Sequence, residues 1–254
     1  LWNDTVTAGS NADTATPSLG GTGPVGYWRF NEGSGSTTAD ASGNGNTGTI
    51  SGAAWTAGSP DSTTALAFDG VDDYVQVANA SSLNPTSALT IEAWIKPNAV
   101  TAGLQKVIVE KAYSSPAAPY YQYCLTVWGT EVYLYVSVNG QLKYQVSSGA
   151  GLAAGTWFHI AAVFDGQNIR IYVNGTLRGS GNVGVGAIPS YNTPLFIGKH
   201  KDFTTERFNG SVDEVRIHNR ALTPADFNLL PVGPQAPALV TNFVASDGEN
   251  AQSA

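Results

Sequence analysis

The chain has 254 residues, a formal net charge of −7 at pH 7 and only 12% charged residues. An acidic chain without a cluster of lysines and arginines repels phosphate, so neither nucleic acid nor an anionic membrane surface is an expected partner. Hydrophobic residues make up 42% of the chain, which is enough for a sizeable core. No apolar run reaches the roughly 18 residues of a membrane span.

The chain divides into three segments. Residues 1–24 are rich in Thr, Ala, Gly and Ser and are predicted to form a linker. Residues 25–231 hold recurrent strand-like runs and are predicted to form one domain, because a β-sandwich of this length commonly folds as one unit. Residues 232–254 begin with a proline-rich spacer and are predicted to start a following β module. The parent protein is therefore expected to have several domains.

Two hairpins give the clearest local signals. Residues 131–138 alternate between Val or Leu and more polar residues, Asn139-Gly140 follows, and residues 141–146 return. Residues 169–173 lead in the same way into Asn174-Gly175. Asn-Gly between alternating runs predicts a two-residue turn, because both turn positions need positive φ.

Other strands are predicted along the chain, but no helical pattern of useful length. The strand ranges are 65–68, 74–77, 89–95, 106–110, 121–127, 157–164, 195–197 and 212–217. Thr223 and Pro224 predict one short helical turn over residues 223–229. The chain is therefore predicted to be all-β, with two stacked antiparallel sheets in a jelly roll or sandwich.

Cys124 is the one cysteine, so no intramolecular disulfide can form. Its apolar surroundings in the sequence predict a buried structural thiol rather than a nucleophile. Secreted eukaryotic domains usually carry several cysteines, so a single one favours a bacterial extracellular or cell-surface protein.

Several motifs in order resemble a known family. They are Tyr27-Trp28-Arg29-Phe30 and the glycine-rich runs 31–35 and 40–48, Phe68-Asp69-Gly70 and 71–75, 90–97, 157–166, 172–175, 197–198 and 210–217. Together they resemble laminin G-like jelly-roll domains of the concanavalin A-like lectin/glucanase superfamily. The resemblance implies a two-sheet sandwich that binds glycans or proteins, often beside a polysaccharide-degrading enzyme and often with calcium. Because the fold hosts both lectins and glucanases, it does not settle function.

The densest aromatic cluster of the chain is the predicted ligand surface, because the apolar faces of sugars stack on flat rings. Its residues are Tyr120, Tyr121, Tyr123, Trp128, Tyr133, Tyr135 and Tyr144. The alternative is that these rings cover a second sheet or pack under loops. Four other tryptophans lie within strand-like motifs and are expected in the core, namely Trp28, Trp55, Trp94 and Trp157.

Calcium prefers oxygen ligands, and aspartates and loop carbonyls supply them. By resemblance, a structural calcium ion would join the early loops to an aspartate on the last strand, with Asp40, Gly70 and Asp213 as its ligands. The alternative is that aspartates cap turns through backbone amides, and this alternative is favoured for Asp69 and Asp72. The three histidines lack the spacing of a transition-metal site.

No catalytic pattern is found in the sequence. The related glucanases carry Glu-x-Asp-x-x-Glu on one strand, and this chain does not contain it. Glu92 stands alone in its predicted strand, and the adjacent Asp213 and Glu214 are expected to face opposite sides of theirs.

The sequence therefore predicts a non-catalytic, lectin-like carbohydrate-binding module of a secreted protein that holds an attached enzyme near polysaccharide. The alternatives are a cell-surface adhesion domain that binds protein and a structural spacer.

Overall fold

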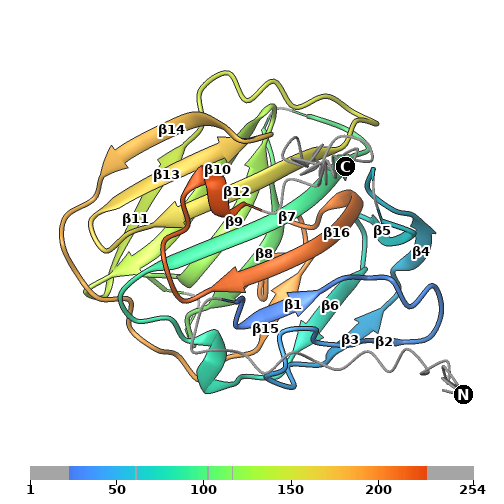
Figure 1. Ribbon diagram of the computed structural model, residues 1–254, viewed down its shortest axis with the longest axis horizontal. Helices are drawn as coiled ribbons and strands as arrows, with labels where there is room; N and C mark the ends of the chain where they lie inside the picture. The colour runs from blue at the N-terminus through green and yellow to red at the C-terminus, as the bar shows by residue number, and fades with distance from the viewer. Residues whose placement is uncertain (1–22, 61, 102, 116, 228–254) are drawn as a thin grey trace, which may run out of the picture.

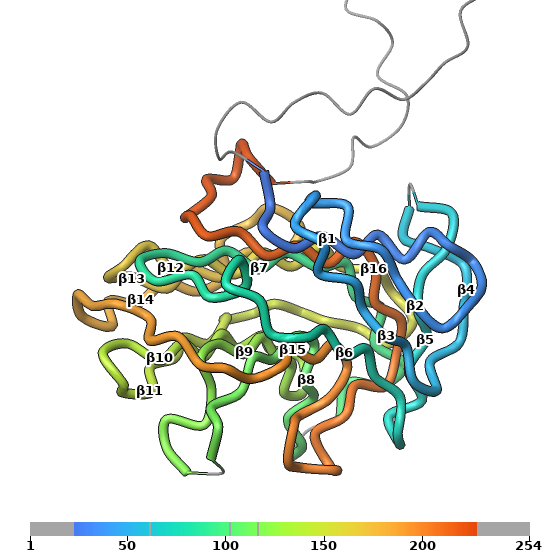
Figure 2. Tube along the Cα trace, turned by 90° about the horizontal axis from the view of Figure 1, so that it is seen from below, coloured from blue at the N-terminus to red at the C-terminus, as the bar shows by residue number. Residues whose placement is uncertain are grey.

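The computed structural model describes residues 23–60, 62–101, 103–115 and 117–227. Within them, two eight-stranded antiparallel sheets face each other (Figure 1). The two layers are seen edge-on in Figure 2. Almost all of the predicted linker 1–24 and the whole predicted start of a following module at 232–254 lie outside the described residues.

The first layer, sheet A, has the strand order β14-β13-β12-β7-β16-β5-β4, and β1 pairs with β16. Its strands are β1 (Gly26–Trp28), β4 (Ala54–Ala57), β5 (Thr64–Asp69), β7 (Leu89–Pro97), β12 (Phe158–Phe164), β13 (Asn168–Val173), β14 (Thr176–Asn182) and β16 (Asn209–His218). Its centre is formed by β7 and β16, strands that lie far apart in the sequence. The fold is therefore built mainly from long-range pairings.

The second layer, sheet B, has the order β11-β10-β9-β8-β15-β6-β3-β2. Its strands are β2 (Thr37–Thr38), β3 (Gly48–Ser51), β6 (Tyr74–Val77), β8 (Gln105–Ala112), β9 (Tyr121–Trp128), β10 (Glu131–Val138), β11 (Gln141–Val146) and β15 (Leu195–Ile197). The all-β jelly-roll prediction is confirmed. Two short 3-10 helices, η1 (Ser81–Leu83) and η2 (Pro224–Asp226), complete the described elements.

Both predicted hairpin turns are present. Asn139 and Gly140 have φ of 51° and 75°, and Asn174 and Gly175 have 49° and 74°. These left-handed values are the conformations that Asn-Gly tolerates best. The predicted turn at Thr223 is also present as η2, where Thr223 and Asp226 form a capping box.

The core lies between the sheets and is filled by alternate residues of each strand. On β10, Val132, Leu134 and Val136 are fully buried, whereas Tyr133 and Tyr135 point outward. Each fully buried aliphatic side chain contributes about 1.5–3 kcal/mol. Trp28 belongs to this core, as predicted, and Cys124 is buried. Of the other tryptophans expected there, Trp55 is only partly buried against the core, and Trp94 and Trp157 are not part of it.

No helix in the described part of the chain is long and apolar enough to cross a membrane.

Candidate functional site

The outer face of sheet B is defined by the register of its strands. Tyr144 on β11 lies opposite Tyr135 on β10, which lies opposite Cys124 on β9. Cys124 pairs in turn with Glu110 on β8, and Glu110 with Phe196 on β15. A shift in register between Val107 and Val109 keeps this row continuous, because the extra residue restores the outward direction of Glu110.

Four aromatic rings follow one another along this face. The centroids of Trp128 and Tyr133 lie 5.9 Å apart, and those of Tyr133 and Tyr135 lie 6.1 Å apart with the ring planes only 11° from parallel. Tyr135 and Tyr144 are separated by 5.5 Å. Trp128 is 42% exposed and Tyr144 57% exposed, and the two tyrosines between them are half-buried. We call Trp128, Tyr133, Tyr135 and Tyr144 the aromatic row.

Two further tyrosines predicted for the site border this row. Tyr121 is only 7% exposed and lies between Tyr135, at 5.6 Å, and His200, at 5.5 Å. Tyr120 is 39% exposed, and its ring centroid is 6.4 Å from that of Tyr121. Tyr121 therefore supports the end of the row, while Tyr120 is available at its rim.

The prediction that Tyr123 belongs to the ligand surface is wrong. Its side chain is 0% exposed and lies in the core, where its hydroxyl donates a hydrogen bond to the backbone oxygen of Leu83 at 3.0 Å. Alternation along β9 sends Tyr123, Leu125 and Val127 inward. The sequence did not reveal this direction, because β9 is apolar on both faces.

A groove of about 390 Å³ opens beside Trp128. Its lining includes Val100, Gly129 and Thr130 from the neighbouring loops and Tyr133 from the row. A second hollow of about 200 Å³ shares Gly129 and reaches Leu104 and Asn209. The surface beside the aromatic row is therefore concave.

Glu110 and His200 form a buried polar pair behind the row. Burial raises the pKa of Glu110 to about 8 and lowers that of His200 to about 4, so both are mostly uncharged at neutral pH. The Nδ1 atom of His200 accepts hydrogen bonds from the backbone N–H groups of Asp202 and Phe203, at 2.9 and 3.1 Å. The ring proton is therefore on Nε2, which lies 3.7 Å from Oε2 of Glu110.

Unpartnered polar atoms are concentrated on this side of the sandwich. Nine of the fifteen buried side-chain N and O atoms without a hydrogen bond in the described residues belong to β8, β9, β10 and the loop after β15. They are carried by Gln105, Glu110, Gln122, Thr126, Ser137, His200, Glu206 and Arg207. Such groups normally find a protein partner, a water or a ligand. Sequence reasoning missed Glu110, His200 and this loop as part of the site.

The predicted calcium ligands do not meet at one point. Asp69 on β5 pairs with Asn209, the first residue of β16, so Gly70 lies beside that end of the strand. Asp213 lies four residues further along β16 than Asn209. Four residues of strand span about 13 Å, which is too far for one ion. The carboxylate of Asp40 accepts hydrogen bonds from the backbone N–H groups of Tyr27, Ser42 and Asn46 and from the Ser42 hydroxyl. Gly70 therefore cannot share an ion with Asp213, and Asp40 caps its own loop.

Asp213 lies in surroundings that suit a cation. Its side chain is fully buried, burial raises its pKa to about 6, and Oδ2 accepts a hydrogen bond from the backbone N–H of Ser59 at 2.9 Å. No described cation pairs with this carboxylate. The hydroxyl of Ser59 is buried without a hydrogen bond, and the Asn31 amide oxygen lies against the Ser62 and Thr63 hydroxyls of the same loop. These oxygens are ligands of the kind that calcium prefers.

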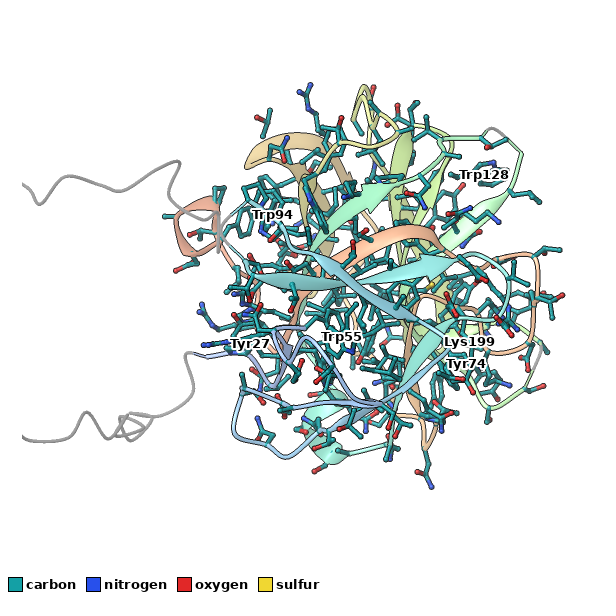
Figure 3. The ribbon with its side chains drawn as sticks, turned by 90° about the vertical axis from the view of Figure 1, so that its right-hand side faces the viewer. Tyr27, Trp55, Tyr74, Trp94, Trp128 and Lys199 are labelled. Carbon is teal, nitrogen blue, oxygen red and sulfur yellow. The ribbon has the colours of Figure 1, made fainter. Side chains whose placement is uncertain are left out.

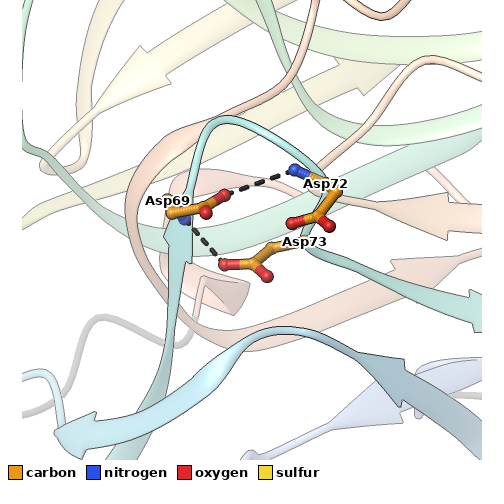
Figure 4. A group of neighbouring side chains, drawn as sticks. All are labelled: Asp69, Asp72 and Asp73. Carbon is orange, nitrogen blue, oxygen red and sulfur yellow. Dashed lines mark hydrogen bonds between the residues drawn. The ribbon is translucent and has the colours of Figure 1, made fainter.

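Three aspartates of the β5–β6 turn form an acidic group (Figure 4). Oδ1 of Asp69 accepts hydrogen bonds from the backbone N–H groups of Val71 and Asp72, which lowers the pKa of Asp69. Oδ2 of Asp73 accepts one from the N–H of Asp69. The predicted turn role is confirmed for Asp69.

The outer face of sheet A holds a second buried polar group that the sequence did not reveal. Glu92 is fully buried and contacts Nε2 of His159 at 3.2 Å and Nε2 of His218 at 3.1 Å. Glu92 is the only acidic residue of β7, as predicted, and pairing with β12 and β16 brings two distant histidines to it. Leu222 and Phe227 pack over this face together with Ala161, Val163 and Tyr172.

The expected opposite directions of Asp213 and Glu214 are wrong. A register shift lies between Asp213 and Arg216, and Glu214 has a positive φ of 53°. Val212 and Val215 consequently both enter the core. Glu214 instead pairs with Arg216 and Tyr27 outside the core.

A larger hollow of about 820 Å³ lies at the β1 edge of sheet A. Tyr27 is the only aromatic residue in its lining, and the guanidinium groups of Arg29 and Arg216 lie 5.1 and 4.1 Å from the centroid of that ring. Because these cations cover the ring, the hollow offers no free aromatic platform. The aromatic row of sheet B is the stronger candidate site.

The chain is a two-sheet jelly roll that carries a row of aromatic rings on the outer face of one sheet. A family model described as the concanavalin A-like lectin/glucanases superfamily matches residues 69–227, more than half of the chain. The chain belongs to this superfamily, as the motifs predicted. No curated protein matches the chain.

Solved structures of low sequence identity share the fold. Domain 4 of an extracellular arabinanase from Geobacillus stearothermophilus, solved with arabinotriose, is 20% identical with a TM-score of 0.57, and the match covers 80% of this chain and 96% of that one. The binding domain of Paraclostridial mosquitocidal protein 1 is 16% identical with a TM-score of 0.65, covering 80% and 50%. The botulinum neurotoxin serotype D ligand-binding domain, solved with N-acetylneuraminic acid, is 13% identical with a TM-score of 0.61, covering 82% and 50%. This chain therefore spans about half the length of the toxin domains.

Proposed function

We propose that this chain is a non-catalytic carbohydrate-binding domain and that its ligand lies on the outer face of sheet B. The observation that carries the proposal is the aromatic row, whose rings are left uncovered beside a groove. Sugar rings present apolar C–H faces that stack on such rings, while their hydroxyls need donors and acceptors nearby. Thr130 and Glu131 line the groove beside Trp128, and their oxygens can supply these.

The similar structures support a binding role over catalysis. Two of them were solved with carbohydrates: domain 4 of the arabinanase with arabinotriose and the serotype D ligand-binding domain with N-acetylneuraminic acid. The proposed biological role is to hold an attached enzyme near polysaccharide outside a bacterial cell.

The alternative of a protein-binding adhesion domain has less support. Such a domain would need a continuous exposed apolar patch. Val71 after β5, Leu177 on β14 and Val185 after β14 are exposed apolar side chains on separate elements, although Leu104 and Phe203 are exposed nearer the row.

We further propose a structural calcium ion beside Asp213 and the loop of Ser59. The ion would offset the buried charge of the Asp213 carboxylate and stabilise the β4–β5 connection. At a concentration one hundred times its dissociation constant, a bound ion adds about 2.7 kcal/mol to the free energy of unfolding. Thermal unfolding in calcium and in chelator tests this. We expect Asp213→Asn to lose the difference and Asp40→Asn to keep it, and an unchanged response of Asp213→Asn would contradict the assignment.

The test of the ligand surface is glycan-array binding of the 254-residue chain and of two variants. Trp128→Ala removes an exposed ring of the row, and Leu177→Ala removes an equally exposed side chain on sheet A. We expect a defined glycan class to bind the unchanged chain and Leu177→Ala, and binding to fall about tenfold or more in Trp128→Ala. Binding that Trp128→Ala leaves unchanged would remove the aromatic row as the site.

A further inference from the structure

The loop of residues 199–207, which joins β15 to β16, lies against the outer side of β8. The backbone N–H of Lys201 donates a hydrogen bond to Oε1 of Glu110 at 2.9 Å. The backbone N–H of Val107 donates one to the backbone oxygen of Glu206 at 3.2 Å. The ammonium of Lys106 donates to the Thr205 oxygen at 2.9 Å. In Figure 2 this loop (orange) extends below sheet B. The loop is thus held at several points along β8.

This anchoring gathers cations that lack a carboxylate partner. Among the described residues, Lys106, Lys199 and Arg207 form no salt bridge, and the one ion pair between a loop cation and a loop acid joins Lys201 to Asp202. The Nε and Nη1 atoms of Arg207 are buried without a hydrogen bond. Lys106, Lys199 and Arg207 are therefore three positive charges without a carboxylate partner beside this loop, in a chain whose net charge is −7.

Lys199 is fixed by the rings beneath it. Its ammonium nitrogen lies 3.6 Å from the centroid of Tyr74 and 4.4 Å from that of Phe196. In Figure 3, Lys199 and Tyr74 lie on the same side of the sandwich as Trp128, while Tyr27 and Trp94 lie toward the other side. Cation–π contact restricts the side chain but leaves its N–H donors free for an anion.

Two carboxyl groups beside this loop have raised pKa values. Burial raises the pKa of Glu110 to about 8 and also raises that of Glu206, which the charge of Lys106 only partly opposes. Asp202 is paired with Lys201. Glu110 therefore carries little negative charge at neutral pH, while burial also lowers the pKa of Lys199.

We propose that the carbohydrate ligand carries a negative charge, a carboxylate or sulfate group, that Lys199 and Arg207 hold while neighbouring sugar units stack on the aromatic row. This inference rests on the proposed function. Tyr135 on β10 and Phe196 on β15 are three strand spacings apart, which is roughly 14 Å at about 4.8 Å per spacing. The ligand is therefore an acidic oligosaccharide of several units, with its charged group at the β15 end.

The test uses calorimetric titration of the 254-residue chain with three probes of equal length. They are an oligogalacturonate, the same oligosaccharide after reduction of its carboxyl groups, and a heparin-derived oligosaccharide. We expect at least one acidic probe to bind about tenfold or more tightly than the reduced probe, because a charge-assisted hydrogen bond has that order of effect. The advantage should shrink as salt screens it.

Two variants and a matched control locate the effect. Lys199→Gln and Arg207→Gln should each reduce acidic-probe binding toward that of the reduced probe. Lys96→Gln should not, although Lys96 also lies over a ring, 5.2 Å from Trp157 on the other sheet. Lys199 is partly exposed, so its variant keeps the test valid if Arg207→Gln fails to fold.

The outcomes separate the two proposals. The reduced probe, or neutral glycans of an array, could bind as tightly as the acidic probes and depend on Trp128. That result would support the proposed carbohydrate binding and contradict the proposal of an acidic ligand. An acidic preference that Lys199→Gln and Arg207→Gln both leave intact also overturns it. If no glycan binds, the proposed function fails, and the inference fails with it.

Discussion

The two outer faces of the sandwich differ in what covers their polar and aromatic side chains. On sheet A, Leu222 and Phe227 pack over the face that holds Glu92 and its two histidines. On sheet B, the rings of Trp128 and Tyr144 remain exposed, and the loop of residues 199–207 covers only part of the face. Aromatic content alone therefore does not mark a ligand surface. The distinguishing feature is a row of rings that the chain itself leaves uncovered.

The largest expected effect lies on the covered face. Phe227→Ala removes a buried ring that packs on Tyr172 at 4.9 Å, and we expect it to lower the free energy of unfolding by about 3 kcal/mol. Glycan binding by the folded variant should be unchanged, since the ring is on the opposite sheet. Denaturant unfolding and a titration measure the two effects. Unchanged stability would show that residues 219–227 do not cover sheet A.

The next effect concerns the Glu110–His200 pair and depends on pH. The pKa of Glu110 rises from 4.5 to about 8 on folding, so its contribution to stability is full below pH 4.5 and is lost as the pH rises toward 8. The pKa of His200 falls from 6.5 to about 4, so its contribution is full above pH 6.5 and is lost as the pH falls toward 4.

Two substitutions separate these contributions in denaturant unfolding measured across pH. Glu110→Gln should remove a loss of a few kcal/mol on the alkaline side, and His200→Gln should remove the loss on the acidic side. Asp165→Asn is a useful control, because its pKa is lowered to about 2 and it lies in the β12–β13 connection of the other sheet. Parallel pH profiles for Glu110→Gln and the unchanged chain would contradict the buried pair.

A smaller effect distinguishes the buried tyrosine from the row. Tyr123→Phe removes the hydroxyl that donates to the Leu83 oxygen, and we expect a loss of about 1–2 kcal/mol of stability with binding unchanged. Thermal unfolding and titration of the same variant provide both readouts. A loss of binding without a loss of stability would return Tyr123 to the ligand surface.

The smallest effect on stability is expected for the exposed end of the row. Tyr144→Ala should change the free energy of unfolding by no more than about 0.5 kcal/mol, because its side chain is mostly in solvent. Its binding should nevertheless weaken, since stacking of an aromatic ring contributes about 0.5–1.5 kcal/mol. The opposite result, reduced stability with full binding, would make the row a structural cover.

Local patterns were sufficient to predict most of the fold. Both Asn-Gly turns, the strands of sheet B other than β2 and β3, and the Thr223 capping box depend on residues close together in the sequence. The family motifs then predicted the two-sheet arrangement. Alternation also identified Tyr133 and Tyr135 as outward-facing, because the opposite face of β10 is aliphatic.

The rest of the site depends on register and packing, which no local pattern encodes. Tyr123 was misplaced because β9 has no polar face. Glu110 and His200 meet only because the loop after β15 folds back on β8. Gly70 and Asp213 were placed together by resemblance, whereas the pairing of β5 with β16 separates them.

The most direct test of the proposed surface is hydrogen-exchange protection mapped along the chain on addition of the glycan that binds most tightly. We expect protection to increase in β9, β10 and residues 199–207 and to stay unchanged in β7, β12 and residues 219–227. Protection confined to sheet A or to the hollow at β1 would contradict the account.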